Sequence, residues 1–358
     1  MTIPNLTFSE EELAHAVTNG LVTQRKHPDY PLYIYNYTPK AAYDRIWNEV
    51  TMTCRGLVLD ENYHIVGKPF RKFWNYGEPE SLSPEAKPLM VRMQATSKCD
   101  GSLGLILSYR GNTFVATRGS FESDQAIWAT NFLKRTYSEF VVPEGLTPLV
   151  EIIYQANRIV VSYGYEDLVL LAVIDNETGA DLPLGSIDWP GPITQIHNLT
   201  SAKDAHDLAM SSEFDDQEGL VLCWPIPNQP SFRLKCKNGN YVLLHKILTG
   251  LSEKRIWEAV KEGKGFDELI GIAPGEIFEW INSVKARLLS EFQEISDHCH
   301  VDLARVELGS RKETAEYFKT CKHPGILFAM LDDKQWQSKI WNMIKPVGNK
   351  TYKVDIDA

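Results

Sequence analysis

Short apolar runs, many of them alternating with polar residues, follow one another from about Tyr30 to Phe232. Glycine, asparagine, aspartate or proline bounds each run, which is typical of short strands joined by turns. The strands predicted in this way are 33–35, 56–59, 103–107, 113–116, 149–153 and 169–174. The helices favoured in this stretch are 125–137 and 202–211, so we expect mostly antiparallel sheet with few helices.

Helices are predicted on both sides of this β-rich stretch. Near the N-terminus, Ser9 and Glu12 form a capping box ahead of an apolar stripe, and Gly20 provides a stop. Helical spacing returns further along, in segments 252–262, 276–298, 312–321 and 333–344. We therefore predict an α+β protein, with a mixed, mostly antiparallel-sheet domain over 1–245 and an all-α domain over 246–358.

Composition narrows the class of protein. At 358 residues, with 43% hydrophobic and 11% aromatic residues, the chain matches an ordinary globular protein of two domains. It has no apolar run of 18 or more residues that could span a membrane, and its first residues lack the features of a signal peptide. Six cysteines without a C-x-x-C pair indicate free thiols, so we expect a cytoplasmic protein. The net charge of −10 disfavours sequence-blind adhesion to nucleic acid but leaves room for a local basic cleft.

The tetrapeptide Lys98-Cys99-Asp100-Gly101 is the first candidate for chemistry. A lysine two residues before Asp-Gly can act as an amine nucleophile at a strand-to-turn corner, where glycine lets the backbone come close to a ligand. Attack on phosphorus requires an unprotonated amine, and we expect nearby cations and partial burial to lower the pKa of Lys98. Alone the signal is weak, because K-x-D-G arises by chance in roughly one protein in ten of this length.

Cations and carboxylates further along the chain add to this signal. Arg233, Lys235 and Lys237 alternate along one predicted strand and therefore project from one face. Their mutual repulsion favours anionic ligands at that face, although the solvated face of an edge strand is the simpler alternative. Glu218 lies at the entrance of a buried strand and Glu151 begins another apolar run, although a lone glutamate at the start of a strand is usually just solvated.

In chain order, these elements form part of a longer series. Its members are Cys54-Arg55-Gly56, Phe70-Arg71-Lys72-Phe73-Trp74-Asn75, Lys98-Cys99-Asp100-Gly101-Ser102-Leu103, Thr117-Arg118-Gly119-Ser120-Phe121, Glu151 with Asn157-Arg158-Ile159-Val160, Glu218-Gly219, and Lys235-Cys236-Lys237 with Tyr241. The series resembles the covalent nucleotidyltransferases, and among them the ATP-dependent RNA ligases of the T-even phage type. The resemblance covers roughly residues 30–245, and the spacing from Lys235 to Tyr241 is especially similar to that branch.

The resemblance implies a role for each of these positions. Lys98 would form a covalent lysyl–AMP intermediate with ATP. Contacts with phosphates, metal or leaving pyrophosphate are implied for the basic residues Arg55, Lys72, Arg118, Lys235 and Lys237. Nucleotide binding or support of its site is implied for Phe73, Asp100, Gly101, Glu151 and Tyr241. Glu151 resembles the acid that binds the ribose. Magnesium, with manganese as a substitute, would be held by Glu218 and Asn157.

Two positions depart from the family pattern. Cys99 stands where many relatives have an acidic residue; a period-two strand would turn it away from the site, so we expect little functional consequence. Arg118 stands where close relatives often have lysine, and a guanidinium binds phosphate with a different geometry from an ammonium.

The activity that the resemblance implies is ATP-dependent joining of RNA 5′-phosphate and 3′-hydroxyl ends, with nicked tRNA as an expected substrate and no obligate protein partner. DNA ligases and GTP-using mRNA capping enzymes share the lysine nucleophile, but they normally continue into a small β-barrel after the Lys-x-Lys strand. This chain turns helical there, and the helical domain is the expected RNA-specificity module. A catalytically silent binder of RNA ends or nucleotides would have lost Lys98, Glu218 or Lys235, and all three are present.

Overall fold

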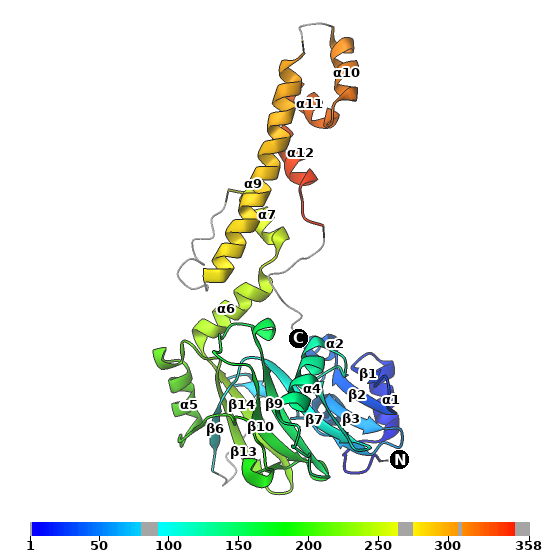
Figure 1. Cartoon of the computed structure of the whole chain (residues 1–358), viewed down its shortest axis with the longest axis vertical. Helices are drawn as coiled ribbons and strands as arrows, with labels where there is room; N and C mark the ends of the chain where they lie inside the picture. The colour runs from blue at the N-terminus through cyan, green and yellow to red at the C-terminus, as the bar shows by residue number, and fades with distance from the viewer. Residues whose placement is uncertain (1, 80–91, 264–274, 307–309, 348–358) are drawn as a thin grey trace. The chain divides into compact units, whose positions relative to one another are not determined.

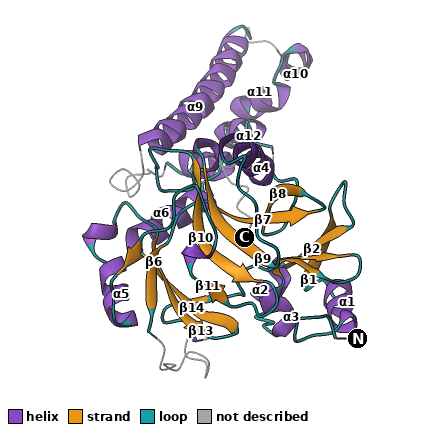
Figure 2. Cartoon of the chain, turned by 60° about the horizontal axis from the view of Figure 1, so that its bottom comes forward, coloured by secondary structure: helices purple, strands orange, loops and turns teal. Residues whose placement is uncertain are grey.

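The computed structural model describes residues 2–79, 92–263, 275–306 and 310–347. The chain divides into two compact units, the first ending at Leu243 and the second beginning at Leu244. The first unit holds all the strands of the described residues, and the described part of the second is helical (Figure 2). Among the described residues, no helix is both long and apolar enough to cross a membrane.

The first sheet is antiparallel, with the strand order β1-β2-β3-β4. Its strands are β1 (Val22–Lys26), β2 (Leu32–Tyr37), β3 (Arg55–Asp60) and β4 (Ile65–Gly67). Helix α1 (Glu10–Thr18) packs on this sheet, and the predicted capping box of Ser9 and Glu12 is present. Two short helices that were not predicted, α2 (Pro39–Tyr43) and α3 (Glu49–Thr53), lie between β2 and β3.

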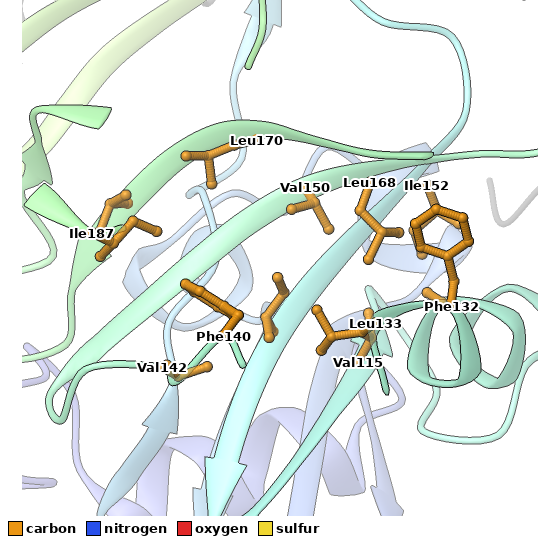
Figure 3. Packing of buried hydrophobic residues seen from close by; sticks show 13 residues of the cluster. Val115, Phe132, Leu133, Phe140, Val142, Val150, Ile152, Leu168, Leu170 and Ile187 are labelled. Carbon is orange, nitrogen blue, oxygen red and sulfur yellow. The ribbon is translucent and has the colours of Figure 1, made fainter. Parts of the chain in front are cut away.

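The second sheet is also antiparallel, with the order β11-β10-β9-β7-β8. Its strands are β7 (Ser102–Tyr109), β8 (Asn112–Thr117), β9 (Leu146–Ile153), β10 (Asp167–Asp175) and β11 (Asp181–Leu182). Helix α4 (Asp124–Thr136) covers one face, where Phe132 and Leu133 project toward the strands that carry Ile152 and Leu168 (Figure 3). Core residues on the opposite face pack against the first sheet.

The third sheet has the order β12-β6-β13-β14-β5, antiparallel except for the parallel pair of β14 and β5. Its strands are β5 (Trp74–Asn75), β6 (Gln94–Ser97), β12 (Ile196–His197), β13 (Gly219–Ile226) and β14 (Gln229–Lys237). Helix α5 (Ala202–Ala209) lies beside this sheet (Figure 1). Its Ala205 and Ala209 belong to the same core cluster as Leu234 and Cys236, so the helix packs on the face that carries these two residues. Because side chains alternate, Lys235 and Lys237 project from the other face. Since β14 lies inside the sheet, the alternative of a solvated edge strand is wrong.

All the strands predicted from the apolar runs are present, as are helices α4 and α5. The remaining short elements of the first unit are the 3₁₀-helices η3 (Gln155–Asn157), η4 (Leu184–Ser186) and η5 (Ser212–Phe214). The predicted α+β class is therefore confirmed, with mostly antiparallel sheets followed by helices.

Helix α6 (Gly239–Gly250), which was not predicted, crosses the boundary between the two units. The other described helices of the second unit are α7 (Glu253–Lys261), α9 (Gly275–Ala304), α10 (Arg311–Thr320), α11 (Pro324–Leu331) and α12 (Trp336–Met343). Helices α7, α9, α10 and α12 correspond to the four predicted segments. Helix α11 was missed because its continuous apolar run has no helical period. Cys299, Phe318 and Ile340 form part of the core of this unit.

Candidate active site

Lys98 lies where the chain crosses from the third sheet to the second. It directly follows β6, and the nucleophile loop, residues 98–101, leads into β7. The backbone N–H of Lys98 donates to the carbonyl of Gly219 at 2.8 Å, which continues the pairing of β6 with β13 and fixes the start of the loop. The ammonium Nζ lies 2.5 Å from Oε2 of Glu218, the residue before β13.

Glu218 is 3% exposed, so its interpretation as a solvated strand end is wrong. Its second oxygen, Oε1, lies 2.9 Å from Nζ of Lys237. Burial alone would raise the pKa of Glu218, but the ammonium groups of Lys98 and Lys237 outweigh it and lower that pKa below its ordinary value. The carboxylate is therefore ionised and bridges two lysines.

Lys98 does not have the lowered pKa that the sequence suggested. Burial lowers the pKa of Lys98, but the carboxylates of Glu218 and Glu151 outweigh burial and raise it above the ordinary value. The prediction was wrong because carboxylates, not cations, dominate the surroundings of the amine. Lys98 is an ammonium at neutral pH, and it becomes a nucleophile only if further positive charge reaches it or its pairing with Glu218 is broken.

The nucleophile loop packs against β9 through Gly101. A Cβ atom at this position would lie 2.6 Å from the carbonyl oxygen of Ile152, so glycine permits a close approach to the protein's own backbone. Glu151 lies inside β9 beside this contact and is 8% exposed, so it is neither the start of the strand nor a solvated end. Burial, together with the carboxylates of Glu218 and Asp100, raises the pKa of Glu151 to about 8.

Basic residues within or close to strands of the three sheets form a cation cluster near Lys98 and Glu218. Its members are Arg55, Lys72, Arg118, Lys235 and Lys237. The ring of Phe73 lies beneath two of them, 5.5 Å from the Arg55 guanidinium and 4.9 Å from the Lys235 ammonium. Burial and the surrounding cations lower the pKa of Lys235 well below its ordinary value. Among the described residues Lys235 has no carboxylate partner, so a bound anion would stabilise its charged form.

Arg55 at the start of β3 offers a donor to such an anion. Its Nη1 is buried without a hydrogen-bond partner within the part of the chain that the structure describes. Burial and the neighbouring Arg118 lower the pKa of Arg55 to about 10. Tyr37 hydrogen-bonds to Arg55, and its ring lies 5.4 Å from the Arg118 guanidinium. Sequence reasoning missed Tyr37, because it lies beyond the predicted strand 33–35 and belongs to none of the motifs.

Arg233 does not belong to the cation cluster. Its guanidinium pairs with the carboxylate of Asp181 on β11 and lies 4.3 Å from the ring centroid of Phe70. The expectation of three cations in need of external anions is therefore corrected. Arg233 and Lys237 have carboxylate partners inside the protein, and Lys235 is the member of the strand that would gain most from a ligand.

The structure also locates the two remaining polar candidates. Asp100 is 2% exposed, and its carboxylate accepts a hydrogen bond from the hydroxyl of Tyr241 at 2.7 Å. Asn157 follows the central strand β9, and both ends of its amide form hydrogen bonds with the second sheet. Its Oδ1 accepts from the hydroxyl of Ser102 at 3.1 Å and its Nδ2 donates to the carbonyl of Ile152 at 2.8 Å.

Glu218 is the group of this site best suited to a metal. Within the described ranges no group of three or more His, Cys, Asp or Glu residues could hold a metal ion. Magnesium is commonly bound by one or two carboxylates together with substrate phosphates rather than by an all-protein cage. A single ionised carboxylate beside a cluster of cations that could hold phosphates fits that pattern. That Glu218 and Asn157 together hold the metal stays a prediction.

A buried lysine, an ionised glutamate and a cation cluster suit chemistry on a phosphate ester. A family model described as RNA ligase matches residues 53–241, which is more than half of the chain and includes Lys98, Glu218 and Lys237. The chain belongs to the RNA ligase family. The prediction of an RNA ligase enzyme is therefore confirmed at the level of the family.

Individual members of the RNA ligase family are distant from this chain. The RNA ligase of Rhodothermus phage RM378 is 22% identical, over 65% of this chain and 68% of that protein. A relative from Thermovibrio ammonificans is 30% identical over 32% of this chain and only 31% of its own length. Among solved structures, an archaeal ATP-dependent RNA ligase (form 2) is 15% identical with a TM-score of 0.46, covering 92% of this chain and 79% of that one.

Proposed function

We propose that this chain is an ATP-dependent RNA ligase that joins a 5′-phosphate to a 3′-hydroxyl through a lysyl–AMP intermediate on Lys98. The observation that carries the proposal is the Lys98–Glu218 pair, 2.5 Å apart, beside the buried Nη1 of Arg55 and the carboxylate-free Lys235. The Lys98 amine and the cations proposed to bind phosphate come from separate parts of the chain but lie close together in the fold. This arrangement favours a covalent nucleotidyltransferase over a protein that only binds nucleotides.

In the first step, the Lys98 ammonium loses a proton and its nitrogen lone pair forms a bond to the α-phosphorus of ATP. The bond from that phosphorus to the bridging oxygen breaks, its electron pair leaves with pyrophosphate, and the nitrogen loses a second proton. Arg55, Lys235 and Lys237 would neutralise the charge of the phosphates during this exchange. Glu151 would bind the ribose, with its protonated carboxyl as a donor or its carboxylate as an acceptor.

Magnesium fits the same site, with Glu218 as its protein ligand and manganese as a substitute. When bound there, the ion supplies positive charge that offsets the attraction between Lys98 and Glu218 and lowers the pKa of the amine.

In the second step, an oxygen of the RNA 5′-phosphate attacks the AMP phosphorus, the N–P bond breaks, and the nitrogen of Lys98 takes up two protons to become an ammonium again. In the third, the 3′-hydroxyl oxygen attacks the RNA phosphate, loses its proton and displaces AMP. Asn157 and Arg158 resemble a family element associated with metal and RNA-end geometry, so Arg158 would contact the RNA end. The helical domain over 246–358 would select the RNA, with nicked tRNA as the expected substrate in RNA repair. The six free thiols fit a reaction in the cytoplasm.

Incubation of the full-length protein with magnesium and α-³²P-labelled ATP, followed by a denaturing gel, tests the covalent step. We expect a labelled band with ATP, no band with labelled GTP, and no band for Lys98→Ala. Label from GTP would indicate a capping-type enzyme. No label from either nucleotide, in folded protein not already adenylylated, would indicate the catalytically silent binder and refute the proposal.

A further inference from the structure

The carboxylate of Asp100 is held by three donors of the protein. Its Oδ1 accepts the hydroxyl of Tyr241 at 2.7 Å. Its Oδ2 accepts the backbone N–H groups of Val160 and Val161 at 2.8 and 2.7 Å. Asp100 is only 2% exposed, so a contact with a nucleotide would have to replace one of these donors. The geometry is that of a group that ties chain segments together.

Tyr241 connects Asp100 to the cation-bearing strand. The ammonium of Lys237 lies 5.3 Å from the centroid of the Tyr241 ring and 2.9 Å from Oε1 of Glu218. The other oxygen of Glu218 lies 2.5 Å from Nζ of Lys98, and Lys98 precedes Asp100 by two residues in the nucleophile loop. The contacts therefore form a closed circuit that begins and ends in this loop.

Tyr241 is itself firmly held. It is 3% exposed, and its backbone N–H donates to the side-chain oxygen of Asn238 at 3.0 Å. The Asn238 amide in turn donates to the carbonyl of Ala209, at the end of α5, at 3.1 Å. The hydroxyl that reaches Asp100 therefore projects from a fixed point at the junction of β14 and α6.

We propose that Tyr241 is a positioning residue: its hydroxyl, acting through Asp100, sets the place of the Lys98 amine relative to the strand that carries Lys237. The proposal rests on the proposed function, and it gives Asp100 a positioning role in place of nucleotide binding.

Loss of the Tyr241 hydroxyl should lower the rate of adduct formation more than the affinity for the nucleotide. Tyr241→Phe keeps the ring beside Lys237, so the cations that bind phosphate remain in place. The nucleophile loop loses one of its anchors, and a displacement of about 1 Å can lower a rate about 100-fold. We expect the maximal rate of adduct formation to fall at least about tenfold. Half-saturating ATP should change less than about threefold.

Single-turnover adduct formation by the full-length chain, over a range of ATP concentrations, tests the proposal. The variants are Tyr241→Phe, Asp100→Asn and the two combined. Tyr35→Phe is the matched control, because Tyr35 is a buried tyrosine of the first sheet whose hydroxyl accepts a hydrogen bond from Gln24. Both single variants should lower the maximal rate. The double variant should be no more than about threefold slower than the slower single, since both remove the same link.

A wild-type rate for Tyr241→Phe, or losses that multiply in the double variant, would overturn the positioning role. A higher half-saturating ATP for Asp100→Asn at an unchanged maximal rate would make Asp100 a nucleotide ligand and overturn it as well. If the wild-type protein forms no adduct, the proposed function fails instead. Thermal unfolding is measured for each variant, and if Tyr241→Phe does not fold, the Asp100→Asn rate and half-saturation decide alone.

Discussion

Glu151 and Lys235 illustrate, at the scale of single residues, how burial opposes charge in this site. Burial, with the neighbouring carboxylates, raises the pKa of Glu151 to about 8. Burial, with the neighbouring cations, lowers the pKa of Lys235 well below its ordinary value. In both groups, burial and neighbours of the same charge favour the neutral form. Binding of an anionic nucleotide beside Lys235 would stabilise its ammonium form, which couples nucleotide binding to proton uptake.

The raised pKa of Glu151 predicts how stability varies with pH. Between 4.5 and about 8 the folded protein binds more protons at this carboxyl than the unfolded chain does. The contribution of Glu151 to stability is therefore fully present below pH 4.5 and is lost as the pH rises through about 8. Glu151→Gln removes this titration. We expect its stability relative to wild type to rise by on the order of 2–4 kcal/mol from about pH 5 to about pH 8.

Urea unfolding of both proteins at several pH values measures this change. Glu61→Gln is the control for replacing a carboxyl with an amide, because Glu61 is exposed in the turn after β3. A constant offset from wild type for Glu151→Gln would contradict a buried, protonated carboxyl.

At the scale of secondary-structure elements, local sequence patterns predicted individual helices and strands better than they predicted which residues pair between strands. The capping box of Ser9 and the apolar strand runs predicted their elements because neighbours in sequence determine them. The motifs likewise indicated Lys98 and Glu218 as members of one site. Tyr37 and Asp181 were missed, because their roles depend on Arg55 and Arg233, which come from other strands. Periodicity along one strand carries no information about such pairs.

Gly101 tests how closely the nucleophile loop must pack on β9. Gly101→Ala would bring a Cβ atom 2.6 Å from the Ile152 carbonyl, so the loop must shift. We expect a loss of about 1–3 kcal/mol in unfolding free energy and a marked loss of adduct formation. Gly185→Ala is the control, since a Cβ atom at Gly185 meets nothing within 4 Å. Equal adduct formation by the two variants would show that the loop tolerates the shift.

Arg233 and Asp181 link β14 of the third sheet to β11 of the second. Both are largely buried, with side chains 8% and 12% exposed. Asp181→Ala leaves the Arg233 guanidinium without its carboxylate partner. We expect the free energy of unfolding, measured with urea, to fall by about 3–5 kcal/mol. The double variant Arg233→Met with Asp181→Leu removes both charges, and its free energy of unfolding should fall much less. A double variant as unstable as Asp181→Ala would refute the charge argument and leave lost packing as the cause.

At the scale of the whole molecule, an acidic chain has the cations of its candidate site in one unit. The net charge of −10 disfavours general adhesion to nucleic acid, so RNA would be held by the cation cluster and by surfaces specific to each unit. Every candidate site residue, including Tyr241 in the first turn of α6, lies in the unit that ends at Leu243. That unit also contains its own hydrophobic cores.

A chain ending at Gly250 keeps α6 whole and removes the remaining helices. Because compact units with their own cores commonly fold alone, we expect it to form the ATP adduct within about threefold of the full-length rate. Its preference for a nicked stem-loop over an unstructured RNA should change by at least about tenfold, equivalent to about 1.4 kcal/mol. Circular dichroism establishes that the shortened chain is folded, and Lys98→Ala in it should abolish the adduct. An unchanged RNA preference would exclude the helical domain as the specificity module, and a folded fragment without adduct would mean that the adenylylation site extends beyond the first unit.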